Sequence, residues 1–416
     1  MIIAIKEKDL NLAFSSNLTD DSKILMNRNI ISRAKQVMPY LIYDENPYMV
    51  ISDEGRLVWV LDAYTVTDKY PYSQHTIIEH DGIREQINYI RNSVKVLVDA
   101  YDGTMNFYIT DKSDPIVMAY RNIYPDLFMD LDESIPEDIA NHFIYPEFLY
   151  KIQAEILQRY HNVSTDVLYR SDDVWEIAKT SKSTAKGVEQ EPYYTMLKTI
   201  DEEEYSLGLV LQYTQLDKQN LRAYLVGEYD KQANAKLKLY KFSQDSTVLG
   251  PMQLDTLLSQ DERISNELES LNISGTKTLK NMIAVPINNT ILYVQSIYKE
   301  NLNETKSTPI LKKVVVACGT KVAIADTKES AIRKLLSQSA VDIEVENTDT
   351  INDLVEAIIR ANSNLENSGN NNDWEMMGKD LKKLQELINK LEILQEEKKK
   401  EEAEKNKINV GNVIVE

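Results

Sequence analysis

Alternation of apolar and polar residues near the start of the chain predicts a β-hairpin followed by a helix. The segment 49–67 alternates on both sides of the sequence DEG, which is typical of a tight turn between two strands. Residues 87–101 instead place Ile87, Ile90, Val94, Leu97 and Val98 at helical spacing. We therefore expect a hairpin and then an amphipathic helix that ends at the following Asp-Gly pair.

The later pattern predicts more strands than helices. A strand at 106–110 precedes a helix that begins with Asp114 as N-cap, and an amphipathic helix follows at 146–160. Beyond these we expect strands at 193–199, 206–213, 222–228 and 236–242, a helix at 253–271, paired strands around Pro286, two strands within 312–326, and a helix at 328–336.

Consecutive strands favour an α+β protein over a doubly wound parallel sheet. We expect mixed, mainly antiparallel sheets with flanking helices, arranged as two packed lobes and a C-terminal helical arm. The polar stretch 179–191 lacks periodicity and is interpreted as a loop or boundary. The predicted division is an N-terminal lobe at 1–178, a sheet-rich lobe at 192–345, and C-terminal helices at 346–416.

The C-terminal part begins with a linker signal and continues with a helical one. Six asparagines within 362–373 predict a flexible linker or loop. Apolar residues then recur at steps of three and four in the helix expected at 374–395, followed by a charged tail. A helix that docks on its own domain is favoured, and a helix that forms a homo-oligomer is the alternative.

Composition excludes several classes of protein. The 416 residues carry 66 acidic and 47 basic side chains, and the resulting net charge of −19 repels phosphate backbones, so no nucleic acid is expected as a partner. The single cysteine, Cys318, excludes an internal disulfide framework. The sequence VVVACGT around it predicts a buried, unreactive thiol. No uncharged segment reaches about 18 apolar residues, the minimum for a spanning helix.

The common catalytic signatures are absent, and no cofactor is expected. The sequence has no P-loop, dinucleotide fingerprint, nucleophile elbow or HExxH zinc motif. His75 and His80, with Glu79 beside them, are a weak metal candidate because no regular spacing aligns them. His161, at the end of a predicted helix, is interpreted as a partner of the helix dipole.

The densest group of chemically useful side chains lies in the sequence WVLDAYTVTDKYPYSQ, residues 59–74. On a strand, Asp62 shares a face with Val58 and Val60, so its carboxylate needs a partner. Arg91 and the Asn88 and Asn92 amides are the expected donors, from the helix that follows. One interpretation is a pocket for a sugar, peptide or cationic group, because tyrosine offers an apolar face and a hydroxyl. Its candidate residues are Asp62, Tyr64, Asp68, Tyr70, Tyr72, Arg91 and Asp102. The favoured interpretation is a structural Asp–Arg pair.

The same segment carries a family resemblance. Residues 59–74, then NYIRNSVKVLVDAYDGT at 88–104, then DPI at 114–116, resemble uncharacterised protein family 0182. Further similar segments, among them YPEFLYKIQ, GPMQ and QDERIS, extend over nearly the whole chain. The resemblance implies a bacterial multi-pass membrane protein whose spanning helices precede a large extracytoplasmic domain. It brings no known substrate or catalytic residue.

We therefore expect this chain to be the extracytoplasmic portion of a membrane protein, serving binding or assembly at the cell envelope without catalysis. Its expected partners are the protein's own spanning segment and envelope components, and the full-length protein is expected in the cell membrane. One alternative is an envelope enzyme that uses a carboxylate pair drawn from Asp62, Asp68, Asp99 and Asp102. The other is a module that captures substrate for transport.

Overall fold

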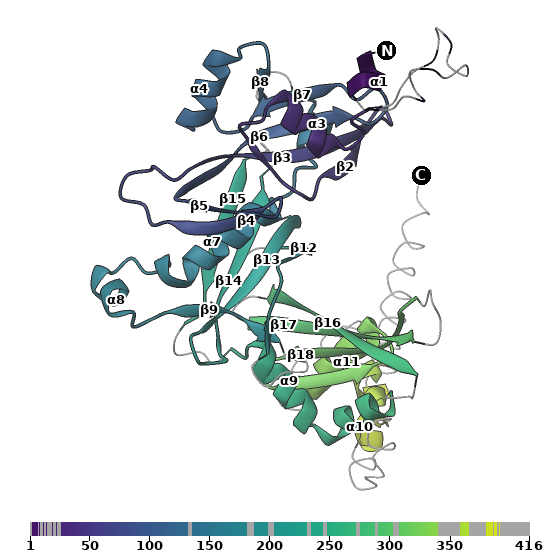
Figure 1. Ribbon diagram of the computed structural model, residues 1–416. Helices are drawn as coiled ribbons and strands as arrows, with labels where there is room; N and C mark the ends of the chain where they lie inside the picture. Colours follow the sequence, from purple (N-terminus) through teal and green to yellow (C-terminus); the bar gives the residue numbers. More distant parts are fainter. Residues whose placement is uncertain are drawn as a thin grey trace, which may run out of the picture.

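The protein has an α+β fold in which three larger sheets follow one another along an elongated molecule (Figure 1). A computed structural model describes residues 2–6, 8, 11, 14, 19, 22, 26–131, 135–180, 187–198, 204–230, 234–243, 248–271, 275–287, 290–302, 308–339, 358–365, 380–385, 387–388 and 391. Within these ranges the sheet pairings are antiparallel, except that β7 and β8 are parallel. The predicted α+β class with mainly antiparallel sheets is confirmed.

The first sheet forms the core of the N-terminal region. Its strands are β1 (Ile42–Tyr43), β2 (Tyr48–Ile51), β3 (Leu57–Thr67), β6 (Tyr89–Asp99), β7 (Met105–Ile109) and β8 (Phe128–Asp130), in the order β1-β3-β6-β7-β8 with β2 also paired to β3. Helices α3 (Ile30–Val37) and α4 (Pro115–Ile123) contribute Ala34 and Val117 to its core, and a short helix α1 (Ile2–Lys6) precedes them. The predicted hairpin is β2–β3, with Ile51 opposite Leu57 and Gly55 at φ +79° in the turn.

The helix predicted at 87–101 is wrong, because most of this segment is strand β6. Strand β6 lies between β3 and β7, and residues 93–98 are buried on both faces. A strand buried on both faces loses the clean alternation of a half-exposed strand, so its apolar residues also fit a helical period. The β-branched Val94, Val96 and Val98 were the signal that favours a strand.

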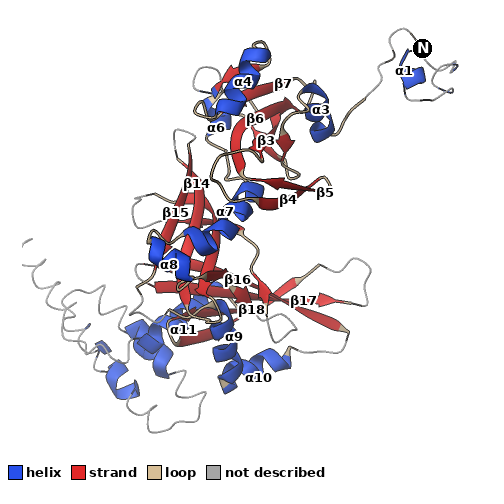
Figure 2. Ribbon diagram, turned by 60° about the vertical axis from the view of Figure 1, so that its left-hand side comes forward, coloured by secondary structure: helices blue, strands red, loops and turns tan. Residues whose placement is uncertain are grey.

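Helix α7 (Glu147–Tyr160) joins the first sheet to the second. Its Leu149 and Ile152 pack with Tyr64 of β3 and with the separate hairpin of β4 (Thr76–His80) and β5 (Ile83–Ile87). On its other side, Tyr150 and Ala154 pack on the second sheet, beside which α7 lies in Figure 2. The predicted helix at 146–160 is therefore confirmed, and short helices flank it at α6 (Glu137–Ala140) and α8 (Thr165–Arg170).

The second sheet is a five-stranded antiparallel sheet. Its strands are β9 (Trp175–Ile177), β12 (Tyr193–Leu197), β13 (Ser206–Gln215), β14 (Leu221–Tyr229) and β15 (Ala235–Lys241), in the order β12-β13-β14-β15 with β9 also paired to β13. These confirm the strands predicted between 193 and 242. The stretch 179–191, interpreted as a loop, instead contributes the short paired strands β10 (Lys179–Thr180) and β11 (Val188–Glu189), with 181–186 outside the described residues.

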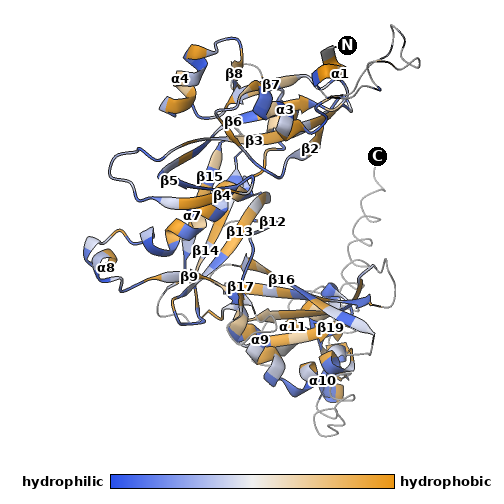
Figure 3. Ribbon diagram, viewed as in Figure 1, coloured by the Kyte–Doolittle hydropathy of each residue, from blue (hydrophilic) through white to orange (hydrophobic). Residues whose placement is uncertain are grey.

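The third sheet closes the fold with helices on both of its faces. Strands β16 (Thr276–Ile287), β17 (Thr290–Asn301), β18 (Ile310–Cys318) and β19 (Lys321–Ala325) follow one another in the sheet. Figure 3 shows hydrophobic residues, in orange, along parts of these strands. Helix α11 (Lys328–Ser339) covers one face. The predicted helix 253–271 is two helices, α9 (Pro251–Gln260) and α10 (Glu262–Ser270), because Asp261 takes extended backbone angles and caps α10.

The C-terminal prediction lies largely outside the described residues. Residues 358–365 are helical, and so is every described residue between 380 and 391. Within them, Leu387 packs with Ala361 in a small cluster that also contains Ile358, Leu384 and Leu391. The linker prediction for 362–373 falls on described helix only at 362–365, and residues 366–373 are not described.

Candidate functional site

The seven candidate residues do not converge on one cavity. Asp62 and Tyr64 are buried in β3, whereas the side chains of Tyr70 and Tyr72 are 51% and 108% exposed in the turn that follows. Tyr70 stacks on Tyr89 with ring centroids 5.3 Å apart. The remaining three lie apart: Asp68 ion-pairs with Lys69, Arg91 with Asp111, and Asp102 lies in the β6–β7 turn.

Asp62 forms an internal ion pair with Lys95. The two residues are direct cross-strand partners on β3 and β6, and Lys95 Nζ donates to Asp62 Oδ1. Asp62 is 4% exposed and Lys95 is 0% exposed. The predicted need for a partner is confirmed, because a carboxylate on this inner face has no access to water.

The prediction of Arg91 as a donor is wrong. An irregular register between Ala63 and Thr65 places Arg91 opposite Thr65, four residues from the position opposite Asp62. Its guanidinium instead donates to Asp111 Oδ2 and Ser113 Oγ, each at 2.7 Å. The Asn92 amide, which the sequence also suggested, does form a side-chain hydrogen bond with Asp62. Its Nδ2 also lies 3.3 Å from the carbonyl of Ala63. The sequence pattern did not identify Lys95 as the partner, because it predicted an amphipathic helix at residues 87–101.

Two aromatic rings from other parts of the chain enclose the lysine. Its Nζ lies 4.9 Å from the ring centroid of Phe143 and 4.9 Å from that of Tyr229. Tyr229 ends β14, so the second sheet contributes directly to the charge environment of the first. A desolvated cation over an aromatic face gains about 2 kcal/mol. The ion pair thus helps to fix the first sheet against the second.

The electrostatics of this cluster follow from burial. Burial raises the pKa of Asp62, and Lys95 only partly offsets that effect. Burial lowers the pKa of Lys95, but the Asp62 carboxylate and then Tyr229 and Tyr48 outweigh burial and hold that pKa above its ordinary value. A lysine so held remains charged at neutral pH, and it neutralises the carboxylate rather than a ligand.

A second carboxylate, Asp44, extends the cluster. Tyr64 Oη donates to Asp44 Oδ2 at 2.6 Å, and the Asp44 backbone N–H donates to the Asp62 carbonyl at 2.9 Å. Burial raises the pKa of Tyr64 well above its ordinary value, and the two nearby carboxylates raise it further. Tyr64 therefore serves as a neutral hydrogen-bond donor. The sequence offered no sign that Asp44 and Tyr64 meet.

Asp114 organises a separate buried cluster of hydroxyls. Its Oδ1 accepts from the Ile116 backbone N–H at 2.9 Å, which confirms the predicted N-cap of α4. The same carboxylate accepts from three hydroxyls, those of Thr65, Ser93 and Tyr89, at 2.5 to 2.8 Å. Asp114, Thr65 and Ser93 are fully buried. Burial, followed by the bond to Asp114, raises the pKa of Tyr89.

Asp99 and Asp102 stabilise the turn between β6 and β7. Asp99 accepts from Arg56 Nη2 at 2.5 Å and from the backbone of the turn, and Asp102 accepts from Thr104 N at 2.9 Å. The bond from Arg56 lowers the pKa of Asp99, and the bond from Thr104 lowers that of Asp102. A general acid at neutral pH needs a raised pKa, so this pair lacks the property that acid–base hydrolysis requires.

The histidines and the cysteine also have local structural contacts. His75 Nε2 lies 3.0 Å from the Asp68 carbonyl, and His80 Nε2 lies 3.2 Å from Glu85 Oε2. His161 ends α7, as predicted, and stacks on Trp175 with centroids 3.4 Å apart. Cys318 is half-buried at the end of β18. Among the described residues, no group of three or more His, Cys, Asp or Glu side chains could hold a metal ion.

These features define an α+β protein. In the segment that carries the family resemblance, residues 59–74, the buried Asp62 is neutralised by Lys95. The chain belongs to the Uncharacterised protein family (UPF0182), whose family model matches residues 1–271. A UPF0182 protein of Caldicellulosiruptor saccharolyticus is 41% identical over 345 residues, which cover 83% of this chain and 37% of that protein. One from Clostridium kluyveri is 36% identical over 410 residues, covering 94% of this chain and 43% of that protein. No solved structure matches the chain.

The buried tyrosines make alkaline pH a sharp test of the packing. Burial raises the pKa of Tyr145 and of Tyr193 to about 12, compared with an ordinary value of 10.0. The unfolded chain therefore loses phenol protons first, and stability present below pH 10 is lost as the pH rises through about 12. Urea unfolding across this range should show a falling free energy. Tyr145→Phe should flatten the fall, and an unchanged slope would contradict the assignment.

Proposed function

We propose that this chain is the extracytoplasmic part of a longer bacterial membrane protein and acts in binding or assembly at the cell envelope. The main support is coverage: the chain spans about two fifths of the length of the relatives it matches, 37% and 43% in two of them. Within the described ranges, no helix is both long and apolar enough to cross a membrane. In this proposal, the spanning segments lie in the part of the whole protein that this chain does not cover. They are the first expected partner of this chain.

The charge of the chain is compatible with this placement. Its net charge is −19, and long domains cross a membrane largely regardless of their charge. Most described ion pairs join a lysine or arginine to a carboxylate and keep at least one side chain partly in contact with solvent, as at Lys35–Asp81 and Arg56–Asp99. Such a surface favours solubility and contact with charged envelope components over phosphate backbones.

Binding is favoured over hydrolysis by the state of the candidate carboxylates. Asp62 is neutralised by Lys95 inside the fold, and Asp99 is bonded to Arg56 in an exposed turn. Retaining and inverting hydrolases need two carboxyl groups about 5–10 Å apart that face one cleft. Asp62 faces the interior and Asp99 faces a surface turn, so these two do not form such a pair.

Cysteine labelling in intact cells tests the proposed side of the membrane. Val163 is 99% exposed, so Val163→Cys in the whole protein gives a reactive thiol on a Cys318→Ser background. A membrane-impermeant maleimide should label this thiol in intact cells of the natural host. The Cys318→Ser background without the new cysteine controls for other reactions. Labelling that appears only after lysis would contradict the proposal.

A further inference from the structure

Strand β16 has one edge that no described strand covers. It is the first strand of the order β16-β17-β18-β19 and pairs only with β17, over twelve residues from Thr276 to Ile287. Two tyrosine hydroxyls cap this edge at Ala284. Tyr193 Oη accepts from Ala284 N at 2.8 Å and donates to Ala284 O at 3.3 Å, and Tyr224 Oη donates to the same carbonyl at 2.8 Å. Beyond that point, towards Thr276, no strand in the described part of the chain pairs with the edge.

The contact with Tyr193 fixes which backbone groups point outward. Ala284 directs both its N–H and its C=O away from β17, so it occupies a pair that is not hydrogen-bonded to that strand. Alternate residues of an antiparallel strand share this orientation. The register from Thr276 to Ile287 is regular, and Thr278, Lys280 and Met282 therefore present outward amide and carbonyl groups. An unpaired row of this kind is a template for an added strand.

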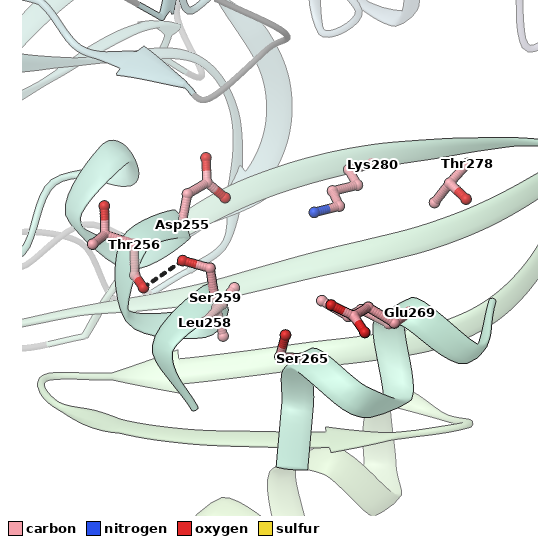
Figure 4. Close-up of a pocket in the computed structure, with 9 residues that line it drawn as sticks. Asp255, Thr256, Leu258, Ser259, Ser265, Glu269, Thr278 and Lys280 are labelled. Atoms are coloured by element: carbon pink, nitrogen blue, oxygen red, sulfur yellow. Dashed lines mark hydrogen bonds between the residues drawn. The ribbon is translucent and has the colours of Figure 1, made fainter. Parts of the chain in front are cut away.

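A groove of about 790 Å³ runs along this edge. Residues 277–282 of β16 form one wall, and Thr180, residues 189–193 and Asp255 form the other. A second pocket of about 380 Å³ adjoins it between β16 and the helices α9 and α10, and the two share Asp255, Thr278 and Lys280. In Figure 4, Lys280 extends from the strand into this space towards the side where Asp255 lies. Six residues of strand span roughly 20 Å, the length of a short extended peptide.

Two side-chain amides in the groove have an acceptor without a donor. Gln295 is 3% exposed and donates through Nε2 to Asp255 Oδ1 at 3.3 Å, while its Oε1 has no partner among the described residues. Gln190 Oε1, on the opposite wall, is likewise buried and without a donor in the described part of the chain. Buried acceptors of this kind are normally satisfied, so both point to N–H groups supplied by an occupant.

The charged side chains along β16 indicate which kind of peptide would bind there. Lys277 and Lys280 are exposed, and within the described residues neither has an ion-pair partner. On the far wall, Asp255 receives the Gln295 amide and Glu191 is paired with Lys151 at 2.9 Å, while Glu189 is exposed. Opposite charges on neighbouring strands attract, and like charges repel. A second copy of β16 would place lysines near lysines, so an acidic partner fits better.

We propose that β16 binds an extended acidic peptide segment of another protein by strand addition. The peptide pairs with the outward groups of Thr278, Lys280 and Met282, and its acidic side chains lie beside Lys277 and Lys280. This inference rests on the proposed binding function and names its site and class of partner. The localisation experiment and the binding experiment below are independent, so either proposal can fail alone.

Fluorescence anisotropy of the purified chain tests the groove. The probe is a fluorescein-labelled peptide of about six residues, the length of the groove, built from Val, Thr and Glu with one Glu on each face of the extended chain. Both faces need a Glu because Lys277 and Lys280 lie on opposite faces of β16. We expect saturable binding that Lys277→Glu/Lys280→Glu weakens about tenfold or more, because two attractive pairs become repulsive. Lys312→Glu, at an exposed position of β18 in the same sheet, is the matched control and should leave binding unchanged.

Two further probes separate strand addition from general charge attraction. A peptide with Lys in place of each Glu should bind at least about tenfold more weakly. N-methylation of alternate backbone nitrogens of the acidic peptide should abolish binding, because it removes the donors that pair with the edge. Equal binding of the basic or methylated peptide, or no binding at about millimolar acidic peptide, would overturn the proposal. Concentration-dependent dimers that Lys277→Glu/Lys280→Glu strengthens would assign the edge to a second copy instead.

Discussion

Replacing Lys95 by methionine is expected to reduce the free energy of unfolding by about 3–5 kcal/mol. The change leaves Asp62 buried without the ammonium that neutralises it, and it removes the cation that lies 4.9 Å from the rings of Phe143 and Tyr229. The Asp62 carboxylate must then take up a proton or stay charged away from water, and either costs stability. Urea unfolding followed by intrinsic fluorescence, with Trp59 in the same strand β3, measures the loss.

Two controls separate the buried pair from charge in general. Asp62→Leu/Lys95→Met removes both charges and should recover most of the loss, since an apolar replacement of a buried pair is often neutral. Lys35→Met breaks the pair with Asp81, whose side chains are 34% and 42% exposed, and should cost less than about 1 kcal/mol. A cost for Lys95→Met as small as that for Lys35→Met would refute the role of the buried ion pair.

The sequence predicted most strands well, including three that are buried on both faces, namely β3, β13 and β14. The glycine turn between β2 and β3 made that hairpin recognisable. Strand β6 has the same burial pattern but was taken for a helix, because its apolar residues also fit a helical period. That error carried forward, since a helix placed Arg91 rather than Lys95 near Asp62.

The candidate site shows the same limit at the level of single residues. That Asp62 needs a partner follows from its place on an apolar face, but the identity of the partner depends on register and on an irregularity at Ala63. Tyr229 reaches the cluster from a strand more than a hundred residues away, with its hydroxyl 3.4 Å from Asn92 Oδ1. Local pattern contains no information on such contacts, because they depend on how two sheets pack.

The edge of β16 was similarly hidden from pattern alone. The sequence predicted paired strands around Pro286, which β16 and β17 confirm. Which of the two lies at the edge depends on the order of strands in the sheet, and the groove depends on β10, β11 and α9 packing beside it. The lysines of the edge strand are a recognised device against unwanted pairing, and the same charges make a matched acidic strand the favoured partner.

Asp114→Ala is expected to cost about 4 kcal/mol, more than the loss of an ordinary helix cap. The change removes the cap of α4, worth about 1 kcal/mol, and leaves the buried hydroxyls of Thr65 and Ser93 without their acceptor at roughly 1–3 kcal/mol each. Urea unfolding measures the cost.

Asp261→Ala is the matched control and should cost about 1 kcal/mol. Asp261 caps α10 through backbone N–H groups alone, apart from an exposed contact with Arg263. Asp114→Asn keeps the acceptor for Ile116 and should fall between the two. Equal costs for the two alanine variants would show that the three hydroxyl contacts contribute nothing, and Asp114 would then be a cap and no more.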